Sequence, residues 1–165
     1  MILSGKRAQT IMDLLLVMIL LTVFGVAILI GMKVSDDLDD EIQADTSLST
    51  EAKDFSRSVN TQYPSFMDTA FLLALVLFWI LLLVSSFMID AHPVFFIVTI
   101  VLLFFVFLIG MILSNTWQDI SSDADLTASA AKFPVMTWVY ANFLIVIIAI
   151  GFSAALALYA KNKIG

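Results

Sequence analysis

Residues 70–89 read AFLLALVLFWILLLVSSFMI and carry no charged side chain. The hydrocarbon core of a bilayer is about 30 Å thick, and an α-helix needs about 20 apolar residues to cross it. A membrane β-strand would be about half as long and would alternate lipid-facing with lumen-facing residues. The length and uniform apolarity of this stretch therefore predict a transmembrane helix and an all-α integral membrane protein.

Three more segments of the chain meet the same criterion. Hydrophobic residues make up 61% of the sequence and charged residues only 13%, whereas about a quarter of a typical soluble domain is charged. We therefore expect residues 1–165 to form a single membrane domain with four antiparallel transmembrane helices. The predicted spans are residues 11–32, 70–89, 93–113 and 137–160.

The two long connections between spans are acidic. Residues 33–69 hold nine acidic side chains against three basic ones, and residues 114–136 add three more aspartates. We expect both segments to be extramembrane loops, the first of them long. Apolar residues four positions apart (Leu38 with Ile42, Phe55 with Val59) also predict short amphipathic helices in the first loop. Ser35 and either Ser49 or Thr50 are the candidate N-caps of these helices.

Basic residues near the span ends favour one orientation. Lys6, Arg7, Lys161 and Lys163 lie beside the first and last spans, on the side that carries both termini. The positive-inside rule places that side inside. The first span is too long for a typical signal peptide, so we expect an uncleaved anchor. The opposite interface would then hold an aromatic belt. Its predicted members are Tyr63, Trp117, Trp138 and Tyr140.

Asp90 and His92 form the polar tip between the second and third spans. A carboxylate beside a histidine is typical of a proton relay or a metal ligand. The alternative is a tight helical hairpin, because Pro93 suits the first turn of a helix and disfavours helical geometry at His92. We expect the hairpin, with Asp90 and His92 as an interface tip that responds to pH.

Two more aspartates border the predicted spans. A carboxylate within a span is a functional candidate by default. Asp13, however, lies in the first turn of its span, where water or headgroups can reach it. Asp68 just precedes the second span. We expect both to complement helix N-termini.

The run DDLDDE supplies the five acidic residues Asp36, Asp37, Asp39, Asp40 and Glu41. Carboxylate oxygens are typical calcium ligands. The run lacks the glycine and the spacing of an EF-hand. We therefore expect a solvated charged face or a docking surface for a basic partner protein.

Small residues recur in the fourth span. Ala149, Ser153 and Ala157 are four positions apart, with Gly151 and Ala155 beside them. Small residues at this spacing let helix backbones approach closely. We expect this stripe to pack against another helix, within the bundle or in a neighbouring subunit of an oligomer.

The sequence offers few chemical motifs. It has no cysteine, one histidine, no glycine-rich phosphate loop and no charge in the middle of a span. The net charge of −6 argues against nucleic-acid binding. We expect no catalytic, cofactor or metal site, and therefore no enzymatic activity.

The segment from about residue 66 to 115 resembles a family of known proteins. Its pattern is an apolar span, SSFMIDAHPVFF, a second span and MILSN. This pattern is similar to small multi-span membrane proteins of marine tailless icosahedral phages with an internal membrane, such as corticoviruses and autolykiviruses. The resemblance implies a structural protein of a virion membrane.

We therefore expect a structural protein of a virion internal membrane or a host cytoplasmic membrane, which docks to other membrane or capsid proteins through acidic loops. A channel or holin-like pore and an accessory subunit of a larger membrane complex are the alternatives. The lipid bilayer is the only other partner we expect.

Overall fold

The computed structural model describes residues 5–88 and 93–164, and within these ranges the protein consists of helices joined by short turns, without strands. Side chains are described for residues 15–87, 100–101, 103–157 and 159–160. The helices are α1 (Gly5–Ala44), α2 (Thr50–Met88), α3 (Pro93–Ser121), α4 (Thr127–Ala130), α5 (Pro134–Ala141) and α6 (Phe143–Ile164).

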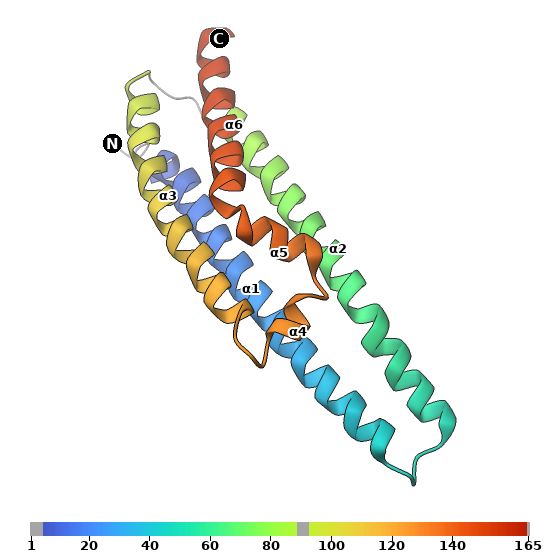
Figure 1. Cartoon of the computed structure of the whole chain (residues 1–165). Coiled ribbons are helices and arrows are strands. Elements are labelled where there is room, and N and C mark those ends of the chain that lie inside the picture. Colours follow the sequence, from blue (N-terminus) through green and yellow to red (C-terminus); the bar gives the residue numbers. More distant parts are fainter. Residues whose placement is uncertain (1–4, 89–92, 165) are drawn as a thin grey trace.

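The all-α prediction is confirmed for the described residues, and the helices are long and apolar enough to suggest a membrane protein. α1, α2 and α3 are each long and apolar enough to cross a bilayer, and α5 with α6 makes a fourth candidate span if this bent pair is counted as one. In Figure 1, α1 and α2 form a long antiparallel pair, and α3 and α6 pack beside one half of it. The first turn of α1, the last turns of α2 and α6 and the first turn of α3 lie at the same end of the molecule.

The predicted span over residues 137–160 is wrong at its start, because the helix breaks at Asn142. This residue has φ −111° and ψ 24°, and α5 bends away from α6 by 75°. Asn142 ends α5 by donating its backbone N–H to the Trp138 carbonyl. α6 has 22 residues, which at 1.5 Å per residue extend about 33 Å and match the bilayer core without α5.

The long loop predicted over residues 33–69 is also wrong. α1 and α2 continue through it as 40- and 39-residue helices. Only residues 45–49 turn the chain, where Asp45 accepts hydrogen bonds from the backbone and hydroxyl of Ser47. Ser49 Oγ accepts the N–H of Ala52 and caps α2, as predicted. Ser35 lies inside α1 and caps nothing. We call residues 33–66 the stalk.

The stalk is helical because its polar residues pair across the two helices. A segment whose composition is typical of a loop can be a helix when its polar side chains bond to a second helix. Most helical stability in proteins comes from such tertiary packing. The predicted loop over residues 114–136 is likewise shortened. α3 runs to Ser121, and α4 and α5 follow where the four-helix part gives way to the stalk (Figure 1).

An aromatic cluster forms the core at that level. Tyr140 stacks on Trp117 with ring centroids 4.1 Å apart, and it also contacts Phe71 and Phe143. The Tyr140 hydroxyl donates to the Leu21 carbonyl at 2.6 Å. Trp117 and Tyr140 are fully buried, so their prediction as interfacial belt residues is wrong. Trp138 is 61% exposed, and Tyr63 is half-buried.

Gly25 makes room for this cluster. A Cβ atom added there would lie 2.9 Å from Tyr140 Oη and 3.0 Å from Trp117 Cζ3. A larger side chain must push two packed rings aside, and overpacking of this kind costs about 1–3 kcal/mol.

We predict that Gly25→Leu lowers the thermal midpoint of the protein in detergent micelles, whereas Ala27→Leu, at an exposed position of the same helix, leaves it unchanged. Equal midpoints for the two variants would contradict the packing of Tyr140 and Trp117 against α1.

Candidate functional site

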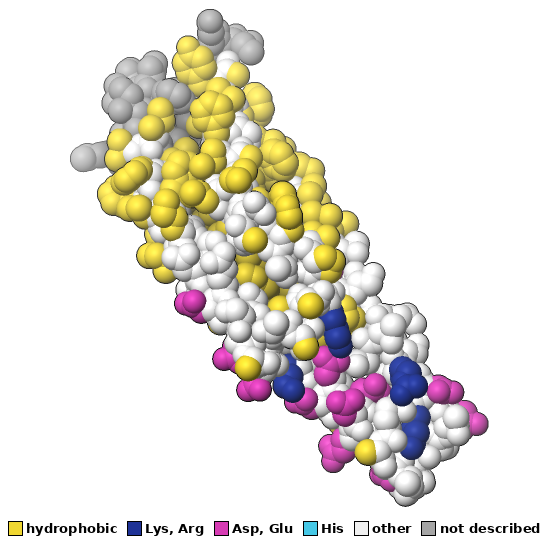
Figure 2. All heavy atoms as spheres, in the orientation of Figure 1, with side chains coloured by type: hydrophobic (Ala, Val, Ile, Leu, Met, Phe, Trp, Pro, Cys, Tyr) yellow, Lys and Arg dark blue, Asp and Glu magenta, His cyan; other side chains and the backbone are white. Residues whose placement is uncertain are grey.

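The charged side chains that the structure describes gather at one end of the molecule. Figure 2 shows apolar side chains over the four-helix part and acidic and basic side chains over the stalk. α1 and α2 each extend about 60 Å at 1.5 Å per residue, twice the thickness of a bilayer core. The stalk is the largest charged surface of the described chain, and it contains all five predicted docking residues.

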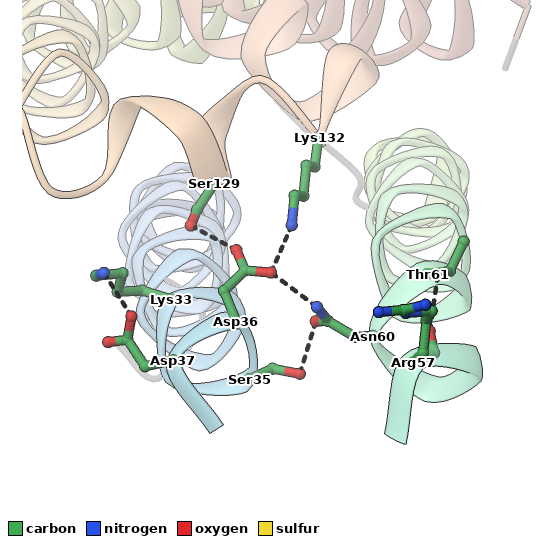
Figure 3. Close-up of polar contacts among 9 residues, drawn as sticks. All are labelled: Lys33, Ser35, Asp36, Asp37, Arg57, Asn60, Thr61, Ser129 and Lys132. Atoms are coloured by element: carbon green, nitrogen blue, oxygen red, sulfur yellow. Dashed lines mark hydrogen bonds and ion pairs between the residues drawn. The ribbon is translucent and has the colours of Figure 1, made fainter. Parts of the chain in front are cut away.

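Asp36 joins the stalk to the rest of the protein (Figure 3). Its carboxylate accepts hydrogen bonds from Lys132 Nζ at 2.5 Å, Asn60 Nδ2 at 2.9 Å and Ser129 Oγ at 3.4 Å. Ser35 Oγ donates to Asn60 Oδ1 at 2.9 Å and extends the network. Three segments distant in sequence, α1, α2 and the connection around α4, are held together here.

The pKa of Asp36 reflects two opposing effects. Burial raises the pKa, and the hydrogen bonds from Lys132, Asn60 and Ser129 together with the Lys132 charge lower it by more. The folded-state pKa therefore lies below the ordinary value, and the carboxylate stays ionised.

Asp39 holds the two stalk helices together farther out. It is buried, and it accepts Ser56 Oγ at 2.7 Å and Gln43 Nε2 at 3.2 Å. These hydrogen bonds lower the pKa of Asp39. Gln43 also donates to the Lys53 carbonyl, and Lys53 Nζ donates to the Gln43 carbonyl, both at 2.9 Å. The helices are thus cross-linked almost to the turn.

The five predicted docking residues divide into two groups. Asp36 and Asp39 accept hydrogen bonds from residues of the same chain and are not free to bind a partner. Asp37, Asp40 and Glu41 are exposed, and Asp37 pairs with Lys33 at 2.6 Å. Asp40 and Glu41 have no ion-pair partner in the described part of the chain.

Two exposed apolar side chains accompany these acids on α1. Val34 is 60% exposed and Leu38 is 54% exposed. The spacing of four and three between Val34, Leu38 and Glu41 places them along one face of the helix. This mixed face was not predicted, although the apolar residues within the acidic run were its signal. We call Val34, Asp37, Leu38, Asp40 and Glu41 the α1 acidic face.

Asp68 caps a helix other than the one expected. Its side chain is buried, and it accepts the backbone N–H groups of Val135 at 2.9 Å and Met136 at 2.8 Å. These are the first amides of α5, whose N-cap residue Phe133 makes no side-chain cap bond. A carboxylate from the middle of α2 thus replaces the missing cap and complements the helix dipole.

The small-residue stripe of α6 divides between the bundle and the surface. Gly151, Ala155 and Ala157 are buried, Ser153 is half-buried and Ala149 is exposed. A Cβ atom on Gly151 would lie 2.3 Å from the Leu103 side chain of α3. Ser153 Oγ accepts Trp79 Nε1 of α2 at 2.9 Å. The stripe therefore brings α6 against both α2 and α3.

The predicted tip residues and the first aspartate of the chain have no described side chains. Asp90 and His92 fall outside the described residues, and the side chain of Asp13 is not described. Among the residues that are described, no group of three or more His, Cys, Asp or Glu side chains could hold a metal ion.

The cavities lined by described residues include an apolar void and a surface groove. An apolar void of about 30 Å³ lies between α1, α2 and α6, and Met18, Leu75, Trp79 and Ile147 are among its walls. An open polar groove of about 530 Å³ lies at the base of the stalk, between α2 and Lys132. The void could hold about one water molecule. The groove is open to the outside of the protein and does not enclose a ligand.

Comparison with protein-family models, curated proteins and solved structures found no match to this chain.

We predict that Asp68→Ala exposes the start of α5. Losing a capping carboxylate costs about 1 kcal/mol or more, so hydrogen exchange at the Val135 and Met136 amides should speed up by roughly five-fold or more. Asp54→Ala, which removes an exposed carboxylate from the same helix, should leave both amides protected. Unchanged protection in Asp68→Ala would contradict the cap.

We also predict an acid-sensitive contribution from Asp36. Because its folded-state pKa is depressed, its stabilisation is present above the unfolded value of about 3.9 and is lost as pH falls through the folded value. The thermal midpoint of Asp36→Asn should therefore fall less between pH 5 and about pH 2 than that of the wild type. Asp40→Asn removes an exposed carboxylate without an ion-pair partner in the described part of the chain and is the matched control, and a fall as steep in Asp36→Asn as in the wild type would contradict the prediction.

Proposed function

We propose that this chain is a non-enzymatic structural membrane protein that holds a rigid acidic stalk outside the bilayer for docking to a partner protein. One observation carries the proposal: α1 and α2 continue unbroken from the apolar bundle into a charged, cross-linked two-helix stalk. A stalk anchored in this way presents a surface at a fixed height above the membrane.

The α1 acidic face supplies the chemistry of recognition. Asp40 and Glu41 keep their charges available, and Val34 and Leu38 offer apolar contact area beside them. A complementary partner surface would carry basic residues around an apolar centre, since complementary charges speed encounter and exclude wrong partners. A basic region of a capsid protein or of another membrane protein has this chemistry.

The bundle interior favours an anchor over a pore. Its centre at the stalk junction is filled by Tyr140, Trp117, Phe71 and Phe143, and its void is lined by apolar side chains. A conducting path would need a polar lining and a continuous opening.

The membrane of a virus particle is the setting we propose, in line with the phage resemblance of the central spans. Basic residues at the two termini favour an orientation with both termini inside, and the stalk would then face the opposite side. There it would meet a shell or a neighbouring membrane protein.

We predict that a photo-crosslinking residue at Leu38, in the natural membrane or particle, forms an adduct with a single other protein. The double variant Asp40→Lys/Glu41→Lys should reduce the adduct by roughly ten-fold, as expected for a loss of about 1.4 kcal/mol in affinity. Glu51→Lys/Asp54→Lys makes the same charge change on α2 and should leave the yield unchanged.

Two results would contradict the proposal. The first is the absence of a heteromeric adduct, or an equal yield from both double variants. The second is recovery of the protein only from membranes of uninfected cells, with none in lipid-containing particles that carry capsid proteins, which would overturn the virion setting.

A further inference from the structure

The stalk part of α2 carries a second exposed apolar face. Phe55 is 72% exposed, Val59 is 45% exposed and Phe66 is 69% exposed. With Ala52, which is also exposed, they are spaced three, four and seven residues apart. Apolar residues spaced by three, four and seven are typical of the a and d positions of a coiled coil.

Lipid does not explain the outer part of this face. Phe55 lies fifteen residues before Ala70, where the apolar segment begins, which corresponds to about 22 Å along the helix axis. Single exposed apolar residues are common on protein surfaces, but large ones aligned along a rigid helix mark an interaction site.

The same seven-residue register can be extended into the membrane segment, where exposed apolar residues also lie on other faces, among them Leu72, Leu77 and Leu81. The a positions are Ala52, Val59, Phe66, Leu73, Ile80 and Phe87, and the d positions are Phe55, Gln62, Thr69, Val76 and Leu83. All are exposed except Leu83, which is half-buried. We call this face the α2 seam.

The other helices of the chain pack against α2 elsewhere. Ser56 bonds to Asp39 of α1, Asp68 to the start of α5, and Trp79 to Ser153 of α6. None of these three residues belongs to the seam. The described part of the bundle therefore leaves the seam uncovered from the stalk to the far side of the membrane.

An occupant that pairs with the stalk part of the seam and continues along it must follow α2 from water into lipid. It must be a helix of similar length, and its apolar repeat must continue beyond the membrane. A second copy of α2 meets both conditions. Two copies inserted in the same direction place their α2 helices parallel, with the same face on each, as twofold symmetry requires.

The charges along the seam agree with self-association. The residues that flank it in the stalk, Ser56, Ser58, Tyr63 and Ser65, are uncharged. The four charged residues of this part, Glu51, Lys53, Asp54 and Arg57, cancel. A basic partner protein would bind the α1 acidic face and not this uncharged face of α2. Gln62 and Thr69 of one copy would each face the same residue of the second copy, which gives these polar side chains a hydrogen-bonding partner in the contact.

We infer that the protein forms a parallel homodimer through the α2 seam, which continues as a coiled coil from the stalk into the membrane. This pairing uses a different face from the α1 acidic face, so it does not depend on the docking partner. It would double the number of acidic faces presented by each assembly.

Single cysteines test the pairing, because the chain contains none of its own. In bilayers under mild oxidation, Phe55→Cys and Val59→Cys should form disulfide-linked dimers roughly ten-fold faster than Arg57→Cys and Thr61→Cys, since a and d positions face their own copies and the controls point away. Equal rates at seam and control positions, or no dimer at the seam, would overturn the inference.

A second measurement does not depend on disulfide chemistry. The stoichiometry of wild type in nanodiscs, counted by single-molecule photobleaching, should be two. Phe55→Glu/Val59→Glu should weaken the dimer by roughly ten-fold or more, because it buries charge at the contact, with helicity unchanged. Arg57→Glu/Thr61→Glu should remain dimeric.

A monomeric wild type, or an adduct of a seam photo-crosslinker with a different protein in the natural membrane, would overturn the dimer. The adduct at Leu38 should persist in Phe55→Glu/Val59→Glu, which separates the two proposals. If a crosslinker at Leu38 forms no adduct while cysteines in the seam still form the disulfide, the docking function is contradicted and the dimer is not.

Discussion

The length of α1 and α2 is the constraint on which the rest of the structure depends. Each helix is about twice as long as a bilayer core is thick, so one continuous element must satisfy lipid along one half and water along the other. In lipid, apolar side chains and internal backbone hydrogen bonds are sufficient. In water, the same two helices need contacts with each other, and Asp39, Ser56, Gln43 and Lys53 provide them.

The junction between these halves is fixed by carboxylates that reach other elements. Asp36 gathers α1, α2 and Lys132, and Asp68 holds the start of α5. Just beyond them, Tyr140 packs against Trp117 and bonds to the Leu21 carbonyl, in space left by Gly25. α5 is thus attached at both ends, which explains why the chain bends at Asn142 instead of continuing straight into α6. The bend positions Lys132 to reach Asp36, so the stalk is attached to the bundle through the α4–α5 region as well as through its own helices.

The sequence predicted the apolar segments well because the bilayer imposes a length that composition alone reveals. It predicted the stalk poorly, because nine acidic residues in 33–69 are typical of a solvated loop, and the pairs Leu38 with Ile42 and Phe55 with Val59 indicated only short helices. The division of the acidic run was also unpredictable: Asp36 and Asp39 bond to residues of other helices, while Asp40 and Glu41 face water. Asp68 was correctly recognised as a cap, but its partners Val135 and Met136 are distant in sequence, and only the fold brings them to it.

The central claim is that α1 and α2 leave the bilayer as a continuous helical stalk. Spin labels at single cysteines along α2, from Ala52 to Phe87, test it through their collision rates with oxygen, which concentrates in lipid, and with a polar nickel reagent, which stays in water. Both collision rates should oscillate with the 3.6-residue period of a helix along the whole of α2. Collisions with the nickel reagent should dominate before Ala70, and collisions with oxygen should dominate after it. A loss of periodicity before Ala70, or oxygen access at Thr61 equal to that at Leu81, both exposed and outside the α2 seam, would contradict it.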